Sequence, residues 1–332
     1  MSRPIMGHLM QILSQSRISD FHLHSGRPLA YRGDGQIQIM DNYTVSHDEL
    51  AQCLSAELGQ EGFQQFMQEG DLDFAMTYEG QRFRASAYRS MTGIALILRV
   101  IITEVPHIEQ LGIPQVVHDV LTQKDGLVLV TGATGSGKST SLAAMIDKIN
   151  RERSETIITI EDPIEFVHIS KQSLVSQREV GRDTKSFGRA LKGALRQDPD
   201  IILLGELRDY ETVSMALTAA ETGHLVFGTL HTNGAPETIN RILDVFPANQ
   251  QGQARAQLSQ SLRLVMTQQL LKRRGGGRIG AFEVMVNIPA VANLIREAKI
   301  VQIDTVMQTS AQHGMITMNK YIERLEQKKL IA

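Results

Sequence analysis

The sequence predicts an α/β protein in which a parallel sheet covered by helices follows a smaller region of mixed α and β structure. Two observations predict this fold class. Between residues 126 and 230, continuous apolar runs alternate with amphipathic helical patterns, as in buried parallel strands joined by helices. Before residue 105, the strand patterns are short and mostly separated by turn residues. We therefore expect two domains, 1–105 and 115–332, joined by a linker at 106–114.

The first domain is expected to be an antiparallel sheet with one prominent helix. Gly33-Asp34-Gly35 is a hairpin signal between two candidate strands, and a helical pattern begins at Ser46. Three strand-like runs follow at 72–78, 82–89 and 94–102, and glycine-containing turns between them predict an antiparallel meander. Pro106, Gly112 and Pro114 indicate the linker.

The second domain contains four apolar runs of strand length. The predicted strands are 126–131, 156–161, 200–205 and 225–230. Amphipathic helical patterns lie between them, from Leu142 to Ile149 and from Phe187 to Leu195. After Pro247 the pattern predicts three helices, at 250–271, 289–298 and 315–327.

The composition limits the classes of function. The chain carries 34 basic and 36 acidic residues, so it lacks the overall positive charge used in non-specific nucleic-acid binding, and no nucleic-acid partner is expected. Its single cysteine, Cys53, excludes an internal disulfide and a four-cysteine zinc site. We expect no signal peptide, because the N-terminus has no sustained apolar core or small-residue cleavage site. We expect no transmembrane segment, because the most apolar stretch elsewhere, 93–102, is interrupted by Arg99 and is too short. These observations favour a soluble, cytoplasmic protein.

A phosphate-binding loop is the most specific motif. Residues 132–139 match G-x-x-x-x-G-K-[ST] at every position, after an apolar strand and before an amphipathic helix. Glycines let successive N–H groups point at phosphate oxygens, Lys138 would reach the β- and γ-phosphates, and Ser139 would bind Mg²⁺. The alternative is a chance match on a glycine-bearing loop. The predicted nucleotide-binding residues are Gly132, Ala133, Thr134, Gly135, Ser136, Gly137, Lys138, Ser139 and Thr140.

Carboxylates follow two of the predicted strands. Glu206 ends the strand 200–205 and would face the phosphate loop, where it could hold Mg²⁺ or orient the attacking water. Glu161, Asp162 and Glu165 close another strand beside the same edge. Three carboxylates near a polyphosphate repel one another unless a cation or a proton transfer uses them. The alternatives are a solvated acid at a strand end and an ordinary acidic loop.

Two histidines and several arginines are further candidates. His231 follows the strand 225–230 at its carboxyl end, where it could position a γ-phosphate, whereas His224 lies at the opposite end and could face another subunit. Structural roles are the alternative for both histidines. The candidate arginines of the first domain are Arg82, Arg84, Arg89 and Arg99. Arginines on a separate domain could supply a finger to a bound phosphate, and solvated strand arginines are the alternative.

Taken together, these motifs resemble the secretion ATPase superfamily, and within it the PilT-like retraction ATPases of type IV pili. The matching segments, spread over nearly the whole chain, are Ser19–His24, Gly132–Ser139, Thr159–Glu165, Leu195–Asp209, Thr222–Thr232 and Gly275–Ile279. The resemblance implies a PAS-like N-terminal domain, a RecA-like P-loop domain and a homo-hexameric ring that binds ATP with Mg²⁺ between the two domains.

The resemblance also implies roles for individual residues. Lys138 and Ser139 look like the Walker A residues, and Glu206 resembles the Walker B glutamate. Glu161 to Glu165 resemble the aspartate box, with Glu165 as its principal acid. His224 and His231 look like the histidine-box residues. Arg84, Arg89 and Arg99 look like the N-terminal-domain arginines that reach the γ-phosphate.

A retraction motor is favoured over an extension motor. Extension and type II secretion ATPases usually carry a further N-terminal domain and a four-cysteine zinc module, and we expect neither in this short chain with one cysteine. Ala290–Glu297 matches the C-terminal retraction motif at six of eight positions, with Ala292 in place of its first arginine. The implied partners are an inner-membrane platform protein and, as a further candidate, a paralogous motor. The alternatives are a secretion or conjugation motor and an accessory nucleotide-gated scaffold.

Overall fold

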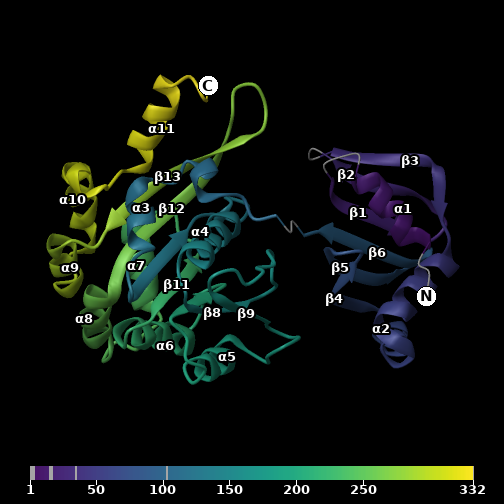
Figure 1. Cartoon of the computed structure of the whole chain (residues 1–332), viewed down its shortest axis with the longest axis horizontal. Helices are drawn as coiled ribbons and strands as arrows, with labels where there is room; N and C mark the ends of the chain where they lie inside the picture. Colours follow the sequence, from purple (N-terminus) through teal and green to yellow (C-terminus); the bar gives the residue numbers. More distant parts are fainter. Residues whose placement is uncertain (1–3, 15–17, 34–35, 102–103, 332) are drawn as a thin grey trace. The chain divides into compact units, whose positions relative to one another are not determined.

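The chain divides into two compact units, unit 1 (Met1–Thr103) and unit 2 (Glu104–Ala332) (Figure 1). The computed structural model describes residues 4–14, 18–33, 36–101 and 104–331. The predicted hairpin turn at Asp34 and Gly35, and Ile102 at the end of a predicted strand, lie outside these residues. The two units are described separately below.

In its described residues, unit 1 is a six-stranded antiparallel sheet with two α-helices. Its elements are α1 (Pro4–Leu13), β1 (Ile18–His24), β2 (Arg27–Gly33), β3 (Gln36–Val45), α2 (His47–Glu69), β4 (Asp71–Tyr78), β5 (Gln81–Ser90) and β6 (Gly93–Val100). The sheet order is β3-β2-β1-β6-β5-β4. The predicted meander is confirmed by the antiparallel pairing of β4 with β5 and of β5 with β6. Ser46 caps α2, since its hydroxyl accepts a hydrogen bond from the Glu49 backbone N–H.

Unit 2 is a seven-stranded sheet with helices on both faces. Its strands are β7 (Gly126–Thr131), β8 (Thr156–Glu161), β9 (Leu174–Glu179), β10 (Ile201–Leu204), β11 (Leu225–Leu230), β12 (Leu262–Lys272) and β13 (Arg278–Val286). Its α-helices are α3 (Gln115–Val120), α4 (Lys138–Glu152), α5 (Phe187–Ala194), α6 (Tyr210–Glu221), α7 (Ala235–Asp244), α8 (Gln251–Ser261), α9 (Pro289–Arg296), α10 (Ile303–Thr309) and α11 (Met318–Gln327).

The sheet order in unit 2 is β13-β12-β7-β11-β10-β8-β9, and all neighbours except β12 and β13 are parallel. The expected α/β class with a parallel sheet is therefore confirmed. Four neighbouring strands of this order, β7, β11, β10 and β8, carry the motifs singled out above, so their carboxyl ends meet at one edge of the sheet.

The sequence 250–271 does not form the single helix that its apolar pattern predicts. Helix α8 ends at Ser261, and the chain continues as β12, which pairs with β7 and β13. Buried Leu262, Leu264 and Met266 alternate along β12, but the apolar residues between and after them give a pattern that also fits a helix. The pattern also missed edge strand β9, which is largely polar.

Residues 106–114, expected to form a linker, lie within unit 2. Ile108–Leu111 is a short 3-10 helix, and Ile108 and Ile113 are buried in the core formed with α4 and the sheet. Proline and glycine interrupt this segment, yet its apolar residues have a buried surface to pack on.

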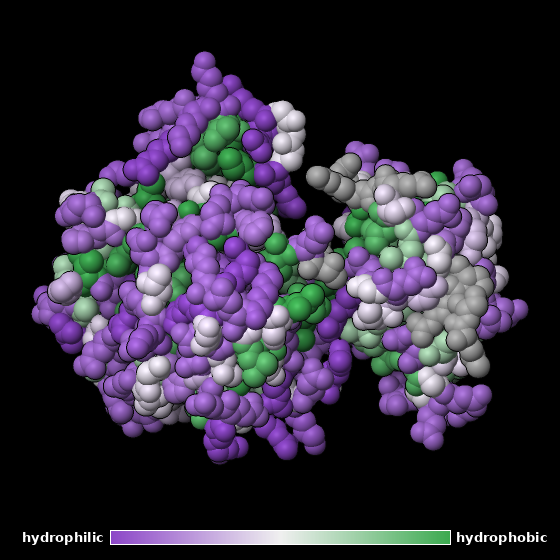
Figure 2. Space-filling view, in the orientation of Figure 1, coloured by the Kyte–Doolittle hydropathy of each residue, from purple (hydrophilic) through white to green (hydrophobic). Residues whose placement is uncertain are grey.

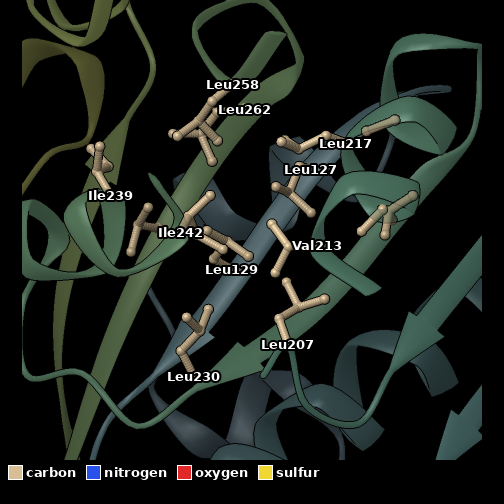
Figure 3. Packing of buried hydrophobic residues seen from close by; sticks show 14 of the residues in the cluster. Leu127, Leu129, Leu207, Val213, Leu217, Leu230, Ile239, Ile242, Leu258 and Leu262 are labelled. Carbon is tan, nitrogen blue, oxygen red and sulfur yellow. The ribbon is translucent and has the colours of Figure 1, made fainter. Parts of the chain in front are cut away.

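Two apolar clusters cover the two faces of the unit 2 sheet. Leu127 and Leu129 belong to the cluster under α6, α7 and α8, and Val128 and Val130 belong to the cluster under α3 and α4. Figure 3 shows the first cluster, in which side chains from the strands interdigitate with those from the helices. Each fully buried Leu or Ile contributes roughly 1.5–3 kcal/mol, so the sheet edge that carries the motifs rests on a rigid support.

The surface is mainly hydrophilic on the face drawn in Figure 2, with small, scattered hydrophobic groups. Within the described ranges of the chain, no helix combines the length and apolarity that crossing a membrane requires.

Candidate functional site

A cavity of about 240 Å³ lies in unit 2 where β7, β8, β10 and β11 end; we call it the strand-end cavity. Its lining comes from the loops that follow these four strands and from the start of α4. Residues singled out in the sequence supply much of it, namely Thr134, Gly135, Lys138, Ser139, Glu161, Asp162, Glu165, Glu206 and His231. Residues from distant parts of the sequence thus meet at one edge of the sheet.

The phosphate loop connects β7 to α4. Gly137 precedes the first residue of α4 with φ of 91°, and Gly132 has φ of 136°, both of which favour glycine. No side chain caps the N-terminus of α4. The positive end of the helix dipole and the free N–H groups of its first turn are therefore available to an anion.

Lys138 brings a positive charge to the strand-end cavity at the phosphate loop. Its Nζ donates to the backbone oxygens of Gly132 (2.7 Å) and Ala133 (3.0 Å) and lies 3.5 Å from Nδ1 of His231. Burial lowers the pKa of Lys138, and the carboxylates of Glu206 and Glu165 act in the opposite direction. Their effect on the pKa places both acids within electrostatic reach of the ammonium group.

Contacts of the two neighbouring residues fix the backbone at Glu206. The preceding residue, Gly205, donates its N–H to Ile160 on β8 and accepts a hydrogen bond from the Thr229 hydroxyl on β11. The following residue, Leu207, is buried in the apolar cluster (Figure 3). It also packs against Gly228. The loop after β10 is therefore fixed to both neighbouring strands, which orients the Glu206 carboxylate.

An arginine and a histidine contact the Glu206 carboxylate. Arg208 Nη2 donates to Oε2 at 2.6 Å, and Nε2 of His231 lies 3.5 Å from the same oxygen. Burial alone would raise the pKa of Glu206, but the hydrogen bond and charge of Arg208 outweigh it and hold the pKa below its ordinary value. Glu206 is therefore ionised at neutral pH.

The acidic loop after β8 has a different electrostatic character. Glu161 Oε1 accepts hydrogen bonds from the Thr159 hydroxyl (2.6 Å) and from Nε2 of Gln177 (3.1 Å). Burial raises the pKa of Glu161 in spite of these bonds, and the Glu165 carboxylate raises it further. Glu206 and Glu161 thus have pKa values shifted in opposite directions, which is typical of sites that transfer protons.

The segment that follows the acidic loop is attached to α4. Asn150, fully buried on α4, donates from Nδ2 to the backbone oxygen of Ile169 and accepts from the backbone N–H of Lys171 at Oδ1. Asp147 on the same helix pairs with the side chain of Lys171. The helix that begins at the phosphate loop therefore also fixes the segment that follows the acidic loop.

Some predicted site residues lie outside the strand-end cavity. His224 stands at the start of β11, where Nδ1 is 3.0 Å from the backbone oxygen of Ala219. Arg84, Arg89 and Arg99 belong to unit 1: Arg99 donates to Asp20 at 2.9 Å and is the register partner of Arg84. Arg89 donates to the backbone oxygen of Met67. The roles implied for these four residues by resemblance stay predictions.

Sequence reasoning missed three residues that shape the site, Arg208, Gln177 and Thr229. Arg208 stands two residues after Glu206 within the motif that carries it, so its proximity was a signal. Gln177 lies on β9, which was not predicted, and Thr229 lies inside an apolar strand. The positions of Gln177 beside Glu161 and of Thr229 beside Gly205 depend on strand order, which no local pattern encodes.

The oxygen donors of the cavity suit Mg²⁺. Ser139 contributes a hydroxyl and Glu206 a carboxylate, both of which are hard ligands. The described residues contain no cluster of three or more His, Cys, Asp or Glu side chains with metal-binding geometry. This arrangement fits a cation held by one or two protein oxygens together with phosphate and water, the usual manner of Mg²⁺.

Comparison with known proteins agrees with the motifs. Residues 64–327 match the family described as type II/IV secretion system protein. The type IV pilus retraction ATPase PilT of Pseudomonas aeruginosa is 46% identical over 98% of this chain and 94% of its own length. The predicted likeness to PilT-type ATPases is confirmed.

Two solved structures show the same architecture. A crystal structure of the pilus retraction motor PilT with bound ADP matches with a TM-score of 0.91 and 45% identity, covering 98% of this chain and 94% of that one. The ATPase DotB of Legionella pneumophila matches with a TM-score of 0.84 and 27% identity, covering 100% and 94%. With its fold, its phosphate loop and these similarities established, the chain belongs to the type II/IV secretion system protein family, among its PilT-like members.

Proposed function

We propose that this protein is a Mg²⁺-dependent, ATP-hydrolysing, hexameric motor that powers type IV pilus retraction, and thereby pilin disassembly and twitching motility. The observation that carries the proposal is the strand-end cavity, which gathers Lys138, Ser139 and Glu206 beside the acidic loop. The relative PilT is a type IV pilus retraction ATPase, which indicates the process, and its structure holds ADP, which indicates an adenine nucleotide.

In this proposal the phosphates bind at the N-terminus of α4. Lys138 leaves the loop carbonyls to contact the β- and γ-phosphates, and Ser139 and Glu206 would hold Mg²⁺, which would neutralise phosphate charge when bound. Glu206, ionised at neutral pH, orients the attacking water and accepts its proton. Because His231 lies within 3.5 Å of both the Lys138 and Glu206 side chains, it connects the phosphate contact with the carboxylate.

The nucleoside half fits a second cavity of about 520 Å³, which we call the hairpin cavity. It adjoins the first turn of α4 at Gly137, Thr140 and Ser141, where the α-phosphate of a P-loop nucleotide would leave the loop. The β12–β13 hairpin and α11 complete it with apolar, aromatic and basic side chains, namely Leu270, Phe282, Tyr321, Arg273, Arg278 and Lys328. This mixture suits a flat base and an anionic sugar phosphate.

The retraction assignment extends beyond the cavity. It rests on the likeness to PilT over nearly the full chain and on Ala290–Glu297, which forms α9 and the residues next to it. Expected partners are further copies of the chain in a hexamer, an inner-membrane platform protein and, as a further candidate, a paralogous motor. The protein would then act in the cytoplasm, peripherally at the inner membrane, without a nucleic-acid partner.

The match to the type II/IV secretion system protein family keeps a motor of a related secretion system as the second candidate. A nucleotide-gated scaffold without useful turnover is the third. It is disfavoured because Lys138, Ser139 and Glu206 all line the cavity in an arrangement suited to hydrolysis.

Steady-state ATPase measurements test the enzymatic part. Lys138→Ala should abolish nucleotide binding or turnover, and Glu206→Gln should keep ATP binding while lowering kcat by about 100-fold or more. The matched controls are Lys192→Ala on α5 and Glu326→Gln on α11, both exposed and outside the cavity, and both should retain wild-type activity. Unchanged activity in both site variants would refute an ATPase.

Pilus counts test the direction of the motor. A deletion strain should carry excess surface pili and lose twitching, and the wild-type gene should restore both, whereas Glu206→Gln should not. Cells without pili would indicate an assembly motor, and normal pili would point to a secretion system.

A further inference from the structure

Strand β12 carries two consecutive glutamines that face opposite ways. Gln268 is 3% exposed, whereas the next residue, Gln269, is exposed. In the parallel pairing of β12 with β7, Thr267 is the register partner of Thr131, and the hydroxyls of these two threonines are 2.9 Å apart. Gln268 therefore lies beside Gly132, the first residue of the phosphate loop.

Gln268 contacts both ends of the phosphate loop. A Cβ atom at position 132 would collide with the backbone oxygen of Gln268, and a Cβ atom at position 137 would lie 2.8 Å from its Nε2. The first and last glycines of the motif are thus needed for the close approach of one residue of β12, in addition to their role in turning the backbone.

The amide of Gln268 is held in one orientation. Oε1 accepts a hydrogen bond of 2.7 Å from the hydroxyl of Ser141, and both residues are buried. This bond leaves the Nε2 donor at Gly137, which immediately precedes α4. Gln268, Ser141 and Thr140 line the hairpin cavity at this point, so the amide stands where the phosphate loop meets that cavity.

The charged side chains that line the hairpin cavity beside this amide are basic. Among the residues that the structure describes, no acidic side chain lines the hairpin cavity, whereas Arg273, Arg278 and Lys328 do. A neutral donor at Gly137 adds partial positive charge to the helix N-terminus, and a carboxylate at the same place would oppose a bound phosphate.

We propose that Gln268 is a positioning residue for nucleotide binding, which holds the two ends of the phosphate loop at the spacing that phosphates require. It acts through Gly132, Gly137 and Ser141. This inference rests on the proposed nucleotide site. Because β12 continues into the β12–β13 hairpin, Gln268 also joins that hairpin to the phosphate loop by a direct contact.

The test compares ADP affinity in the full-length protein, by calorimetry, for wild type, Gln268→Met, Gln268→Glu and Gln269→Met. Gln268→Met preserves the length of the side chain without hydrogen bonds and should weaken ADP binding about tenfold. Gln268→Glu keeps the acceptor for Ser141 but adds negative charge, so it should weaken binding further, with a loss that shrinks as salt is added. Gln269→Met is the matched control and should bind ADP as wild type does.

Two further readouts separate positioning from simple packing. If Gln268 positions the loop, its substitution raises KM for ATP more than it lowers kcat. The substitution also reduces the rise in melting temperature that ADP causes, while the melting temperature of the nucleotide-free variant stays within a few degrees of wild type. Ser141→Ala should reproduce part of the loss and add nothing to Gln268→Met, because both remove the same hydrogen bond.

The outcomes are distinguishable from failure of the proposed function. If wild type itself does not bind ADP, the nucleotide site is wrong. If wild type binds ADP and both Gln268→Met and Gln268→Glu bind it as tightly as wild type does, the positioning role is refuted. If Gln268→Met does not fold, the ADP affinities of Gln268→Glu and Ser141→Ala decide the question. Gln268→Glu keeps an acceptor for Ser141, and Ser141→Ala places only a small side chain at the contact.

Discussion

The lowered pKa of His168 should make the stability of unit 2 depend on pH. The residue follows the acidic loop, lines the strand-end cavity and is 9% exposed, and its buried Nδ1 has no hydrogen-bond partner among the described residues. Burial lowers its pKa from 6.5 to about 4, with Asp147 opposing and Lys171 reinforcing the change. The folded protein therefore keeps His168 neutral where the unfolded chain is protonated.

The sign and size of the effect follow from this pKa. As the pH falls below 6.5, the unfolded state gains a proton that the folded state refuses until the pH nears 4, so stability is lost through this window. Between about pH 7.5 and about pH 5, the contribution of this one group to the unfolding free energy falls by about 2 kcal/mol.

The perturbation is His168→Gln, which removes the titration while keeping a polar side chain of similar length. Urea unfolding of wild type and variant at the two pH values isolates the term, because the other groups titrate in both proteins. Wild type should lose about 2 kcal/mol more than the variant on acidification. The exposed His313→Gln is the control and should behave as wild type. Equal losses in wild type and His168→Gln would refute the reasoning.

Three further predictions concern the site and its supports. Leu207→Ala removes a buried side chain next to Glu206 and should destabilise the protein by about 2–4 kcal/mol in urea unfolding and lower kcat; retained kcat would show that Leu207 does not orient the carboxylate. Gln177→Leu removes a hydrogen bond that favours the ionised form of Glu161, so its pKa should rise and the acid limb of the kcat–pH profile should move to higher pH; an unmoved limb would contradict this. Arg99→Ala should slow ATP hydrolysis while the circular dichroism stays native; a wild-type rate would leave Arg99 with only its surface ion pair.

Much of the site was predictable because each part is local. Glycines, lysine and serine at fixed spacing, after an apolar strand and before an amphipathic helix, identify a phosphate loop wherever they occur. Glu206 and His231 were predictable for a related reason: each follows a buried strand, and parallel strands present their carboxyl ends at one edge.

The helical prediction for 250–271 failed for a physical reason. Apolar residues at 262, 264, 265, 266, 270 and 271 satisfy a helix and a buried strand alike, and the free edge of β7 decided between them by offering hydrogen bonds to a strand. The segment 106–114, predicted to be a linker, is part of unit 2, because Ile108 and Ile113 pack in its apolar core.

The sequence by itself determined the α/β class of the protein, the phosphate loop and the acids that follow the strands, because these depend on residues close to one another along the chain. Only the tertiary structure decided which distant groups meet them. Gln177 on β9 donates a hydrogen bond to Glu161, whose pKa is nonetheless raised by burial, whereas Arg208 outweighs burial and lowers the pKa of Glu206. Gln268, 127 residues after Ser141, contacts both ends of the phosphate loop. Such contacts arise from strand order and register, which are set by packing of the whole sheet rather than by any local pattern.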